Sequence, residues 1–408
     1  MIKKFKFVII GVTILMCIGT LSGCATYDNF VNEFFGDGSN LDTIKIAMYE
    51  PITGEFSDEA TAEIRGIELA NKLFPEVLGK KVELVYADNG SDLNTAKTTL
   101  ENLVKNKPSV VLGSYGSAFS MLAGPVFKHA KIPALTITNT NPLVNSDNPY
   151  YFRVCFVEAY QGRALATFTI QHLQATKAAV MIPQGDDYAM ALSTTYSDML
   201  ETLTQNPNVV TTVQNYNTGD MDFSKQLNAI SKSGATVVFL PAGINDAQTI
   251  IAQAKKLSLN LTFLGSEAWA TDEFIQPAIR AGLANYFFPT AYDSANSKTE
   301  MAAVFLKAYK KEYGSGTPNE ATALGFDAYL LALDAMTRAD TATDGAKIIE
   351  ALSGVVDFQG ASGVIRFDAQ GDPERSVIIN TVIDGKIAPV FTVSPAPTTE
   401  TPVTPTSQ

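Results

Sequence analysis

The sequence predicts an α/β protein with two lobes, each built on a doubly wound parallel sheet. Short apolar runs alternate with helical patterns in units of about 30 to 40 residues, which is typical of strand–helix–strand units. This alternation stops at an extended stretch, residues 150–157, and then begins again. The chain has 408 residues, more than one hydrophobic core usually organises, so a second lobe is expected.

The first lobe begins with two strand–helix units. Residues 43–48 form an apolar strand, and residues 60–74 place apolar side chains at helical spacing. A second strand is predicted over residues 82–87. Asp92 follows it at a position where a carboxylate can cap a helix, which we predict over residues 93–106.

Two neighbouring strands of this lobe end in loops rich in hydroxyl and amide groups. The apolar run 110–112 leads into the turn GSYGS, whose last residue, Ser117, opens a helical pattern. The run 133–137 leads into TNTN, which contains Thr138 and Thr140. Ligands of open α/β sheets bind beyond the carboxyl ends of the strands, and a helix start favours an anion such as a carboxylate. The alternative is that Ser117 only caps its helix and that the second loop is merely polar.

The second lobe repeats the alternation. Its strands are predicted over residues 178–182, 209–216, 236–240 and 261–264. The last strand runs into Glu267, and a carboxylate just beyond a buried strand is poorly placed for an ordinary surface charge. We expect residues 285–292 to return the chain to the first lobe, where helices over residues 301–313 and 321–336 complete it.

The segment GSYGSAFSMLAGPVFKHAKIPALTITNTNP, residues 113–142, resembles the branched-chain amino acid-binding proteins of ABC transporters. The resemblance runs from about residue 43 to about residue 384 and includes the turn PITG. It implies the type I periplasmic-binding fold, in which three chain crossings form a hinge between the lobes. The implied crossings lie near residues 154–158, 290–293 and 356–359.

The resemblance also divides the chain. Lobe one is expected to comprise residues 43–156 and 291–357, and lobe two residues 157–290 and 358–393. A closing β segment, residues 363–367 and 377–383, then belongs to lobe two.

The resemblance implies a site for the two charged groups of an amino acid. Ser117, Thr138 and Thr140 match lobe-one positions that hold the α-carboxylate and α-ammonium. Glu267 matches the acidic residue of lobe two that neutralises the ammonium, and Tyr188 matches a tyrosine that closes over the ligand. The alternatives are a salt bridge or helix cap for Glu267, and packing on the sheet for Tyr188.

Two positions depart from the family pattern. Gly243 and Glu59 stand where many relatives have aromatic residues. We expect Tyr115 and Trp269 to supply part of the wall of the side-chain pocket instead. A ligand with a larger, polar or basic side chain is therefore a hypothesis beside a branched-chain one.

The N-terminus has the pattern of a lipoprotein signal. Residues 1–23 combine three lysines with a short apolar core and end in LSG, and the sequence LSGC resembles a lipobox. The resemblance implies that Cys24 carries a lipid and that residues 24–42 tether an extracytoplasmic protein to the bacterial cell membrane. An ordinary signal peptide or an uncleaved anchor is the alternative. Residues 394–408, rich in Pro and Thr, are predicted to be disordered.

Composition argues against several functions. The net charge of −12 disfavours nucleic acid as a partner. The chain has two histidines, His129 and His172, and both lie in helical stretches without the cluster that a metal site needs. No P-loop or nucleophile elbow follows a strand, so we expect no enzyme, no catalytic residue and no cofactor. Cys155 lies between apolar residues and is predicted to be a buried structural thiol.

The predicted partners follow from this interpretation. They are an amino acid, an ABC permease in the membrane, and the membrane itself through the lipid on Cys24, with the protein itself a monomer. A receptor module of the same fold that senses an amino acid, an amide or a small carboxylate is the alternative.

Overall fold

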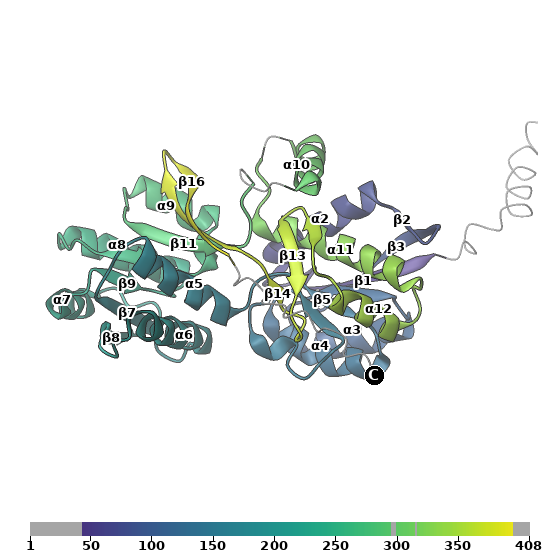
Figure 1. Ribbon diagram of the computed structural model, residues 1–408, viewed down its shortest axis with the longest axis horizontal. Helices are drawn as coiled ribbons and strands as arrows, with labels where there is room; N and C mark the ends of the chain where they lie inside the picture. Colours follow the sequence, from purple (N-terminus) through teal and green to yellow (C-terminus); the bar gives the residue numbers. More distant parts are fainter. Residues whose placement is uncertain (1–42, 295–298, 315, 395–408) are drawn as a thin grey trace, which may run out of the picture.

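The computed structural model describes residues 43–294, 299–314 and 316–394, and it shows two α/β lobes side by side (Figure 1). The predicted fold class is confirmed. The predicted signal peptide, the tether with Cys24 and residues 395–408 of the predicted tail lie outside the described residues. Within the described ranges, none of the helices has the length and apolar character needed to cross a membrane.

Lobe one contains a six-stranded sheet in the order β2-β3-β1-β4-β5-β6. The strands are β1 (Ile44–Glu50), β2 (Glu76–Val77), β3 (Lys80–Asp88), β4 (Val110–Gly113), β5 (Ala134–Thr136) and β6 (Tyr151–Arg153). All of them pair in parallel except β2, which is an antiparallel edge strand. The carboxyl ends of β4 and β5 therefore meet at one edge of the sheet, as predicted.

Helices cover both faces of this sheet. They are α2 (Ser57–Leu73), α3 (Leu93–Lys105), α4 (Ser117–Ala130), α10 (Glu300–Tyr313), α11 (Glu320–Ala339) and α12 (Gly345–Ser353). Successive side chains of a strand alternate, so Ile46 and Met48 of β1 enter one core while Ala47 and Tyr49 enter the core on the opposite face. Asp92 caps α3, as predicted.

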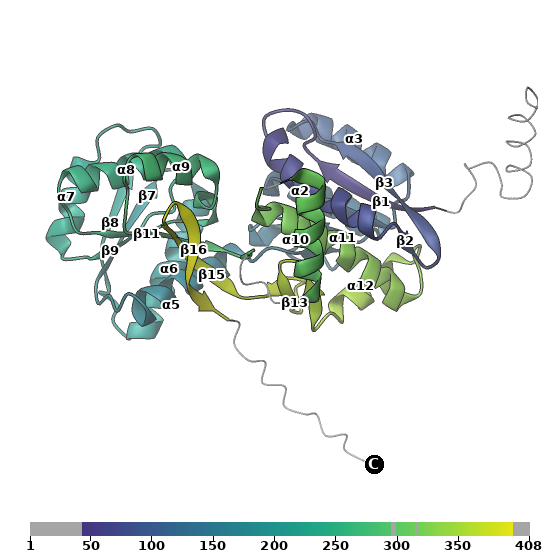
Figure 2. The same cartoon turned by 90° about the horizontal axis from the view of Figure 1, so that it is seen from above.

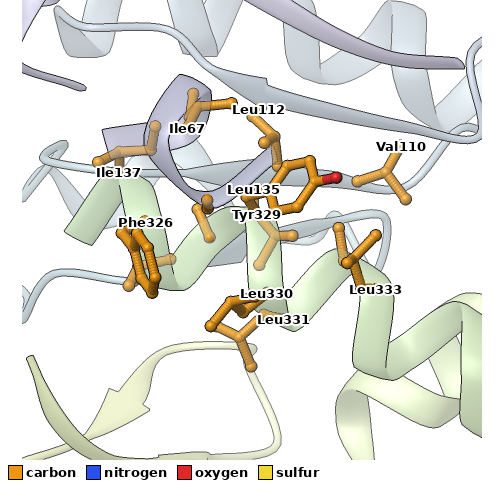
Figure 3. Close-up of a cluster of buried hydrophobic side chains, with 14 of the residues drawn as sticks. Ile67, Val110, Leu112, Leu135, Ile137, Phe326, Tyr329, Leu330, Leu331 and Leu333 are labelled. Carbon is orange, nitrogen blue, oxygen red and sulfur yellow. The ribbon is translucent and has the colours of Figure 1, made fainter. Parts of the chain in front are cut away.

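Helix α11 lies at the centre of lobe one, although it comes late in the chain. Its Phe326 and Tyr329 belong to the same buried cluster as Ile67 of α2 (Figure 3). The two helices touch through glycine, because a Cβ at Gly325 would lie 2.3 Å from the carbonyl oxygen of Glu63. A helix buried on nearly every side needs no polar face, which explains its apolar sequence.

Lobe two contains a seven-stranded sheet in the order β16-β15-β11-β10-β9-β7-β8. The strands are β7 (Ala178–Pro183), β8 (Val210–Tyr216), β9 (Val237–Phe239), β10 (Thr262–Leu264), β11 (Tyr286–Thr290), β15 (Val377–Ile383) and β16 (Lys386–Val393). The four predicted strands correspond to β7, β8, β9 and β10. The helices are α5 (Glu158–Gln171), α6 (Asp187–Thr204), α7 (Ser224–Ser233), α8 (Ile244–Lys256) and α9 (Asp272–Arg280). β11 belongs to this sheet, so most of the predicted return segment, residues 285–292, lies in lobe two. The second crossing begins after Thr290.

A small antiparallel sheet packs on lobe one, not on lobe two. It consists of β12 (Phe358–Gly360), β13 (Gly363–Phe367) and β14 (Pro373–Glu374). Ile365 and Phe367 belong to the core that contains α11, and the ring of Phe367 lies 5.0 Å from that of Phe152. The predicted assignment of residues 363–367 to lobe two is therefore wrong, and the third crossing follows β14 instead of lying at residues 356–359.

One arginine connects all three crossings. Arg375, between β14 and β15, is 3% exposed. Its guanidinium donates to the carbonyl oxygen of Val154 in the first crossing at 2.8 Å and of Ala291 in the second at 2.8 Å. It also donates to the carbonyl oxygen of Ser362 at 3.0 Å. The hinge is thus joined by a buried residue that the sequence did not single out.

Candidate ligand-binding site

The turn between β4 and α4 presents Ser117 at a helix start. The N-cap residue of α4 is Gly116, which has no side chain, and no side-chain hydrogen bond caps the helix. Ser117 is half-buried and is the first helical residue, so its hydroxyl is not engaged as a cap. The free N–H groups and the dipole of the first turn favour an anion beside this hydroxyl. The alternative that Ser117 merely caps the helix is not supported.

The loop after β5 is held from inside the protein by Arg153 of β6. The fully buried guanidinium donates to the carbonyl oxygens of Asn139 and Asn141, the latter at 2.9 Å, and its Nε donates to Asp372 at 2.7 Å. The buried thiol of Cys155, a structural thiol as predicted, donates to the same Asn139 carbonyl at 3.1 Å, and burial raises its pKa. These contacts hold the backbone that carries Thr138 and Thr140, both of which remain half-buried.

On lobe two, Glu267 lies in a short 3-10 helix, η2 (Glu267–Trp269), directly after β10. The hydroxyl of Tyr188 donates to both carboxylate oxygens of Glu267, at 2.9 and 2.7 Å, and the side-chain amide of Gln161 donates to Oε2. Removal from water raises the pKa of Glu267, and these two donors lower it. Gln161 was missed by sequence reasoning, because a glutamine in a helical pattern gives no sign of a partner 106 residues away.

Neither alternative for Glu267 is supported. Within the described part of the chain it forms no salt bridge with a lysine or arginine. It is not a cap either, because the N-cap residues of η2 and α9 are Ser266 and Thr271. Glu267 is thus a half-buried carboxylate with two neutral donors and no cationic partner among the described residues.

The two sets of residues lie on facing parts of the two lobes. The N–H of Glu158, at the start of α5, donates to the carbonyl oxygen of Thr140 at 3.1 Å, and the Thr140 hydroxyl donates to the Glu158 carboxylate at 3.3 Å. Burial and then the charges of Glu59, Glu63 and Glu267 raise the pKa of Tyr115 to about 12. Tyr115 of lobe one therefore lies within the electrostatic range of Glu267 of lobe two.

Trp269 does not lie with the candidate ligand-binding residues. It is fully buried in the core of lobe two, stacked on Phe274 with ring centroids 4.7 Å apart, and its indole N–H donates to the carbonyl oxygen of Ala242 at 2.9 Å. A Cβ at Gly265 would lie 2.1 Å from this indole, so the glycine makes room for it. The expected contribution of Trp269 to a pocket wall is corrected to a role in the core. Gly243 is exposed, with nothing near the position of a Cβ.

Other features of the surface do not suggest a different site. A hollow of about 510 Å³ lies at the C-terminal end of α2, the opposite end from Glu59, and none of the candidate residues lines it. In the described ranges, no group of three or more His, Cys, Asp or Glu side chains is arranged to hold a metal ion.

Comparison with known proteins identifies the family. A model of the periplasmic binding protein family matches residues 43–386. The chain belongs to the periplasmic binding protein family.

Two proteins of Pseudomonas aeruginosa are among the relatives of this periplasmic binding protein. A protein named amino acid binding protein is 28% identical over 202 residues, 49% of this chain and 53% of the relative, so the match spans about half of that protein's length. The leucine-, isoleucine-, valine-, threonine- and alanine-binding protein is 24% identical over 81% of this chain and 87% of its own.

Solved structures agree with this family assignment. A leucine-binding protein of Thermotoga maritima superposes with a TM-score of 0.75 at 31% identity, covering 86% of this chain and 99% of its own. A solute-binding protein of R. palustris in complex with benzoate gives a TM-score of 0.71 at 19% identity, covering 88% and 98%, which shows the shared fold.

The stability of this periplasmic binding protein should depend on pH, because several hinge carboxyl groups are removed from water. Burial raises the pKa of Glu158 and Glu320 to about 7 and that of Asp327 to about 6. A carboxyl whose pKa is higher in the folded chain stabilises it fully below the unfolded pKa, and this contribution is lost as the pH rises through the folded pKa. We expect a higher midpoint of thermal unfolding at about pH 5.5 than at about pH 8, measured by calorimetry at constant ionic strength. An unfolding midpoint that increases with pH over this range would show that these carboxyl groups do not have raised pKa values in the folded protein.

Proposed function

We propose that this chain is an extracytoplasmic solute-binding lipoprotein of an ABC importer, which binds an amino acid of the branched-chain type or a related one between its lobes and delivers it to a membrane permease. One observation carries the proposal. Glu267 is a half-buried carboxylate without a lysine or arginine partner among the described residues, and its charge acts on Tyr115 in the lobe-one turn that leads to Ser117. A zwitterion supplies the missing cation and an anion for the helix start.

The two charged groups of the ligand are assigned from the donors and acceptors on each lobe. Ser117 and the first N–H groups of α4 donate to the α-carboxylate. Glu267 accepts from the α-ammonium, with Tyr188 and Gln161 holding its carboxylate in place. The Thr140 hydroxyl is a further ligand contact on lobe one. Burying a neutral polar group without a hydrogen-bond partner costs about 2–7 kcal/mol. Burying either charged group of the ligand without a partner would cost more.

Closure of the lobes completes the proposed cycle. The solute binds lobe one first, and lobe two rotates about the three crossings to cover it. The crossings lie at residues 154–157, immediately after β11, and at Arg375. The closed form then docks on the permease.

We propose that the protein is a monomer, tethered to the cell membrane through a lipid on Cys24.

The names of the relatives suggest the ligands to test. One relative from P. aeruginosa is named for leucine, isoleucine, valine, threonine and alanine, and a structural neighbour was solved with benzoate. Both classes carry a carboxylate, but benzoate has no ammonium for Glu267. This chain should therefore prefer α-amino acids to aromatic acids.

A thermal-shift screen followed by calorimetry tests the proposal. The panel contains the twenty amino acids, benzoate and 4-hydroxybenzoate, applied to the protein without its signal segment. We expect one or a few α-amino acids to raise the unfolding midpoint and neither benzoate to do so. Stabilisation by the benzoates alone would contradict the ammonium site, and no response across the panel would exclude an amino acid receptor.

Tyr188→Phe tests the environment of Glu267. The variant removes a hydroxyl that donates to a charged group, a contact worth about 1.5–3 kcal/mol, so we expect roughly tenfold weaker binding of the amino acid found in the screen. Tyr160→Phe is the matched control, because in the described chain the hydroxyl of Tyr160 has no hydrogen-bond partner. Equal affinities of the two variants would show that Tyr188 does not support the ligand.

A further inference from the structure

Two carboxyl groups are buried beneath the ligand-facing loops of lobe one. Glu50 is the last residue of β1, and Glu63 lies in α2; both are 0% exposed. Neither pairs with a lysine or arginine among the residues that the structure describes. If both carboxyl groups were ionised, two negative charges would be buried side by side without a cation, which is energetically unfavourable.

Each carboxyl group holds one of the two loops. Oε2 of Glu50 accepts a hydrogen bond from the N–H of Tyr115 at 2.6 Å, in the turn that leads to Ser117. Oε1 of Glu63 accepts one from the hydroxyl of Thr138, in the loop after β5. The pair therefore connects the two loops from which the proposed ligand contacts of lobe one come.

The remaining oxygens identify the state of the pair. Oε1 of Glu50 and Oε2 of Glu63 are both buried, and neither has a hydrogen-bond partner in the described chain when both groups are ionised. The side chains of Glu50 and Glu63 lie within hydrogen-bonding reach of each other. One proton shared between the two groups makes one oxygen a donor and the other an acceptor, which removes both unpaired atoms and one of the two charges. Glycine makes room for this arrangement, because a Cβ at Gly113 would lie 2.2 Å from Oε1 of Glu50.

The surroundings agree with a shared proton. Burial, followed by the charge of Glu63, raises the pKa of Glu50 well above its ordinary value, and burial raises the pKa of Glu63 to about 7. The ionisable groups that face the pair are the phenols of Tyr49 on β1, Tyr151 on β6 and Tyr115. All three are neutral at physiological pH, so none offsets a second negative charge.

We propose that Glu50 and Glu63 share one proton as a carboxylic acid–carboxylate pair, and that this pair positions the Tyr115 and Thr138 loops for the ligand. Both are positioning residues. This inference rests on the proposed function, because it takes the two loops to be the ligand-binding loops. The proton of the Thr138 hydroxyl is committed to Glu63, so the oxygen of Thr138 is left to accept from a ligand donor such as an ammonium.

The proposal predicts proton-linked binding. Loss of the shared proton leaves two facing carboxylates that repel each other, and the loops that they hold move from their binding positions. We expect the affinity for L-leucine to fall as the pH rises through the pKa of the pair, by up to roughly tenfold for each pH unit above it.

Two substitutions at Glu63 separate positioning from simple packing. Glu63→Gln keeps an acceptor for Thr138 and supplies a permanent donor to Glu50, so we expect the pH dependence of leucine binding to disappear. Glu63→Ala removes both contacts, and we expect it to bind at least about tenfold more weakly than Glu63→Gln. Glu101→Gln, an exposed charge change on α3 of the same lobe, should keep the wild-type pH dependence.

Infrared spectroscopy tests the proton itself, without any ligand. A difference spectrum between the wild type and Glu63→Gln should contain the carbonyl band of a protonated carboxylic acid at about pH 6, and this band should weaken as the pH is raised through the pKa of the pair. Absence of the band, or a pH dependence of binding that is the same in Glu63→Gln, would overturn the proposal. If leucine does not bind the wild type at all, that result counts against a branched-chain ligand, and the infrared result still decides on the pair.

Discussion

Replacing Glu267 with glutamine is expected to weaken amino acid binding by about a hundredfold or more, because removing one partner of a buried charge pair costs about 2–5 kcal/mol. The substitution preserves the size of the side chain but leaves the ammonium of the bound ligand without a counter-charge. The donors that now stabilise the carboxylate, Tyr188 and Gln161, would then face a neutral amide. Isothermal titration calorimetry with the amino acid found in the screen measures the effect.

The control for this prediction is Glu273→Gln. Glu273 lies in the first turn of α9, a few residues beyond Glu267, and it is exposed. The same charge is removed from the same lobe, so a general electrostatic effect would appear in both variants. Wild-type affinity in Glu267→Gln would refute the proposed ammonium site, and with it the zwitterion as the ligand.

Replacing Arg375 with methionine is expected to lower the free energy of unfolding by about 3–5 kcal/mol, the usual cost of removing one partner from a buried charged network. The guanidinium holds carbonyl groups from two other crossings and from Ser362. Its charge also lowers the pKa of Glu320 and Asp327, both of which burial raises. Methionine would leave these carbonyl groups without their donor and Glu320 and Asp327 without a nearby positive charge.

Urea unfolding followed by circular dichroism measures this effect. Arg280→Met, an exposed change at the end of α9, is the matched control and should change stability by less than about 0.5 kcal/mol. Arg375→Lys keeps the positive charge, but a single ammonium cannot replace the several donors of the guanidinium. We therefore expect a loss of unfolding free energy between those of the other two variants. Equal stabilities of Arg375→Met and the control would show that the hinge does not depend on this residue.

The candidate site could be predicted from the sequence in part, and its missing members share one property. Ser117, Thr140 and Glu267 each lie three or four residues beyond the end of an apolar strand, so the rule that ligands bind beyond strand ends and the family resemblance both lead to them. Gln161 lies within a helix and is recognisable only through its contact with Glu267, 106 residues later. Arg375 likewise contacts a residue 221 positions earlier, Val154.

Two errors have the same cause. The apolar alternation of residues 363–367 correctly predicts a strand, but it does not say which lobe the strand joins. The contact of Phe367 with Phe152 of lobe one decides that. Trp269 follows a strand end as Glu267 does, yet the turn of η2 directs the indole into the core, where Gly265 leaves room for it.

Apolar periodicity and turn composition are local properties of the chain, so most of the strands and helices, the two-lobed α/β class and the polar strand ends could be predicted from them. The lobe that each late strand joins, the residue that connects the hinge and the pairing of Glu50 with Glu63 became known only from the folded structure. Those features depend on contacts between distant segments. A buried charge or an unpaired oxygen has a meaning only when its neighbours in space are known.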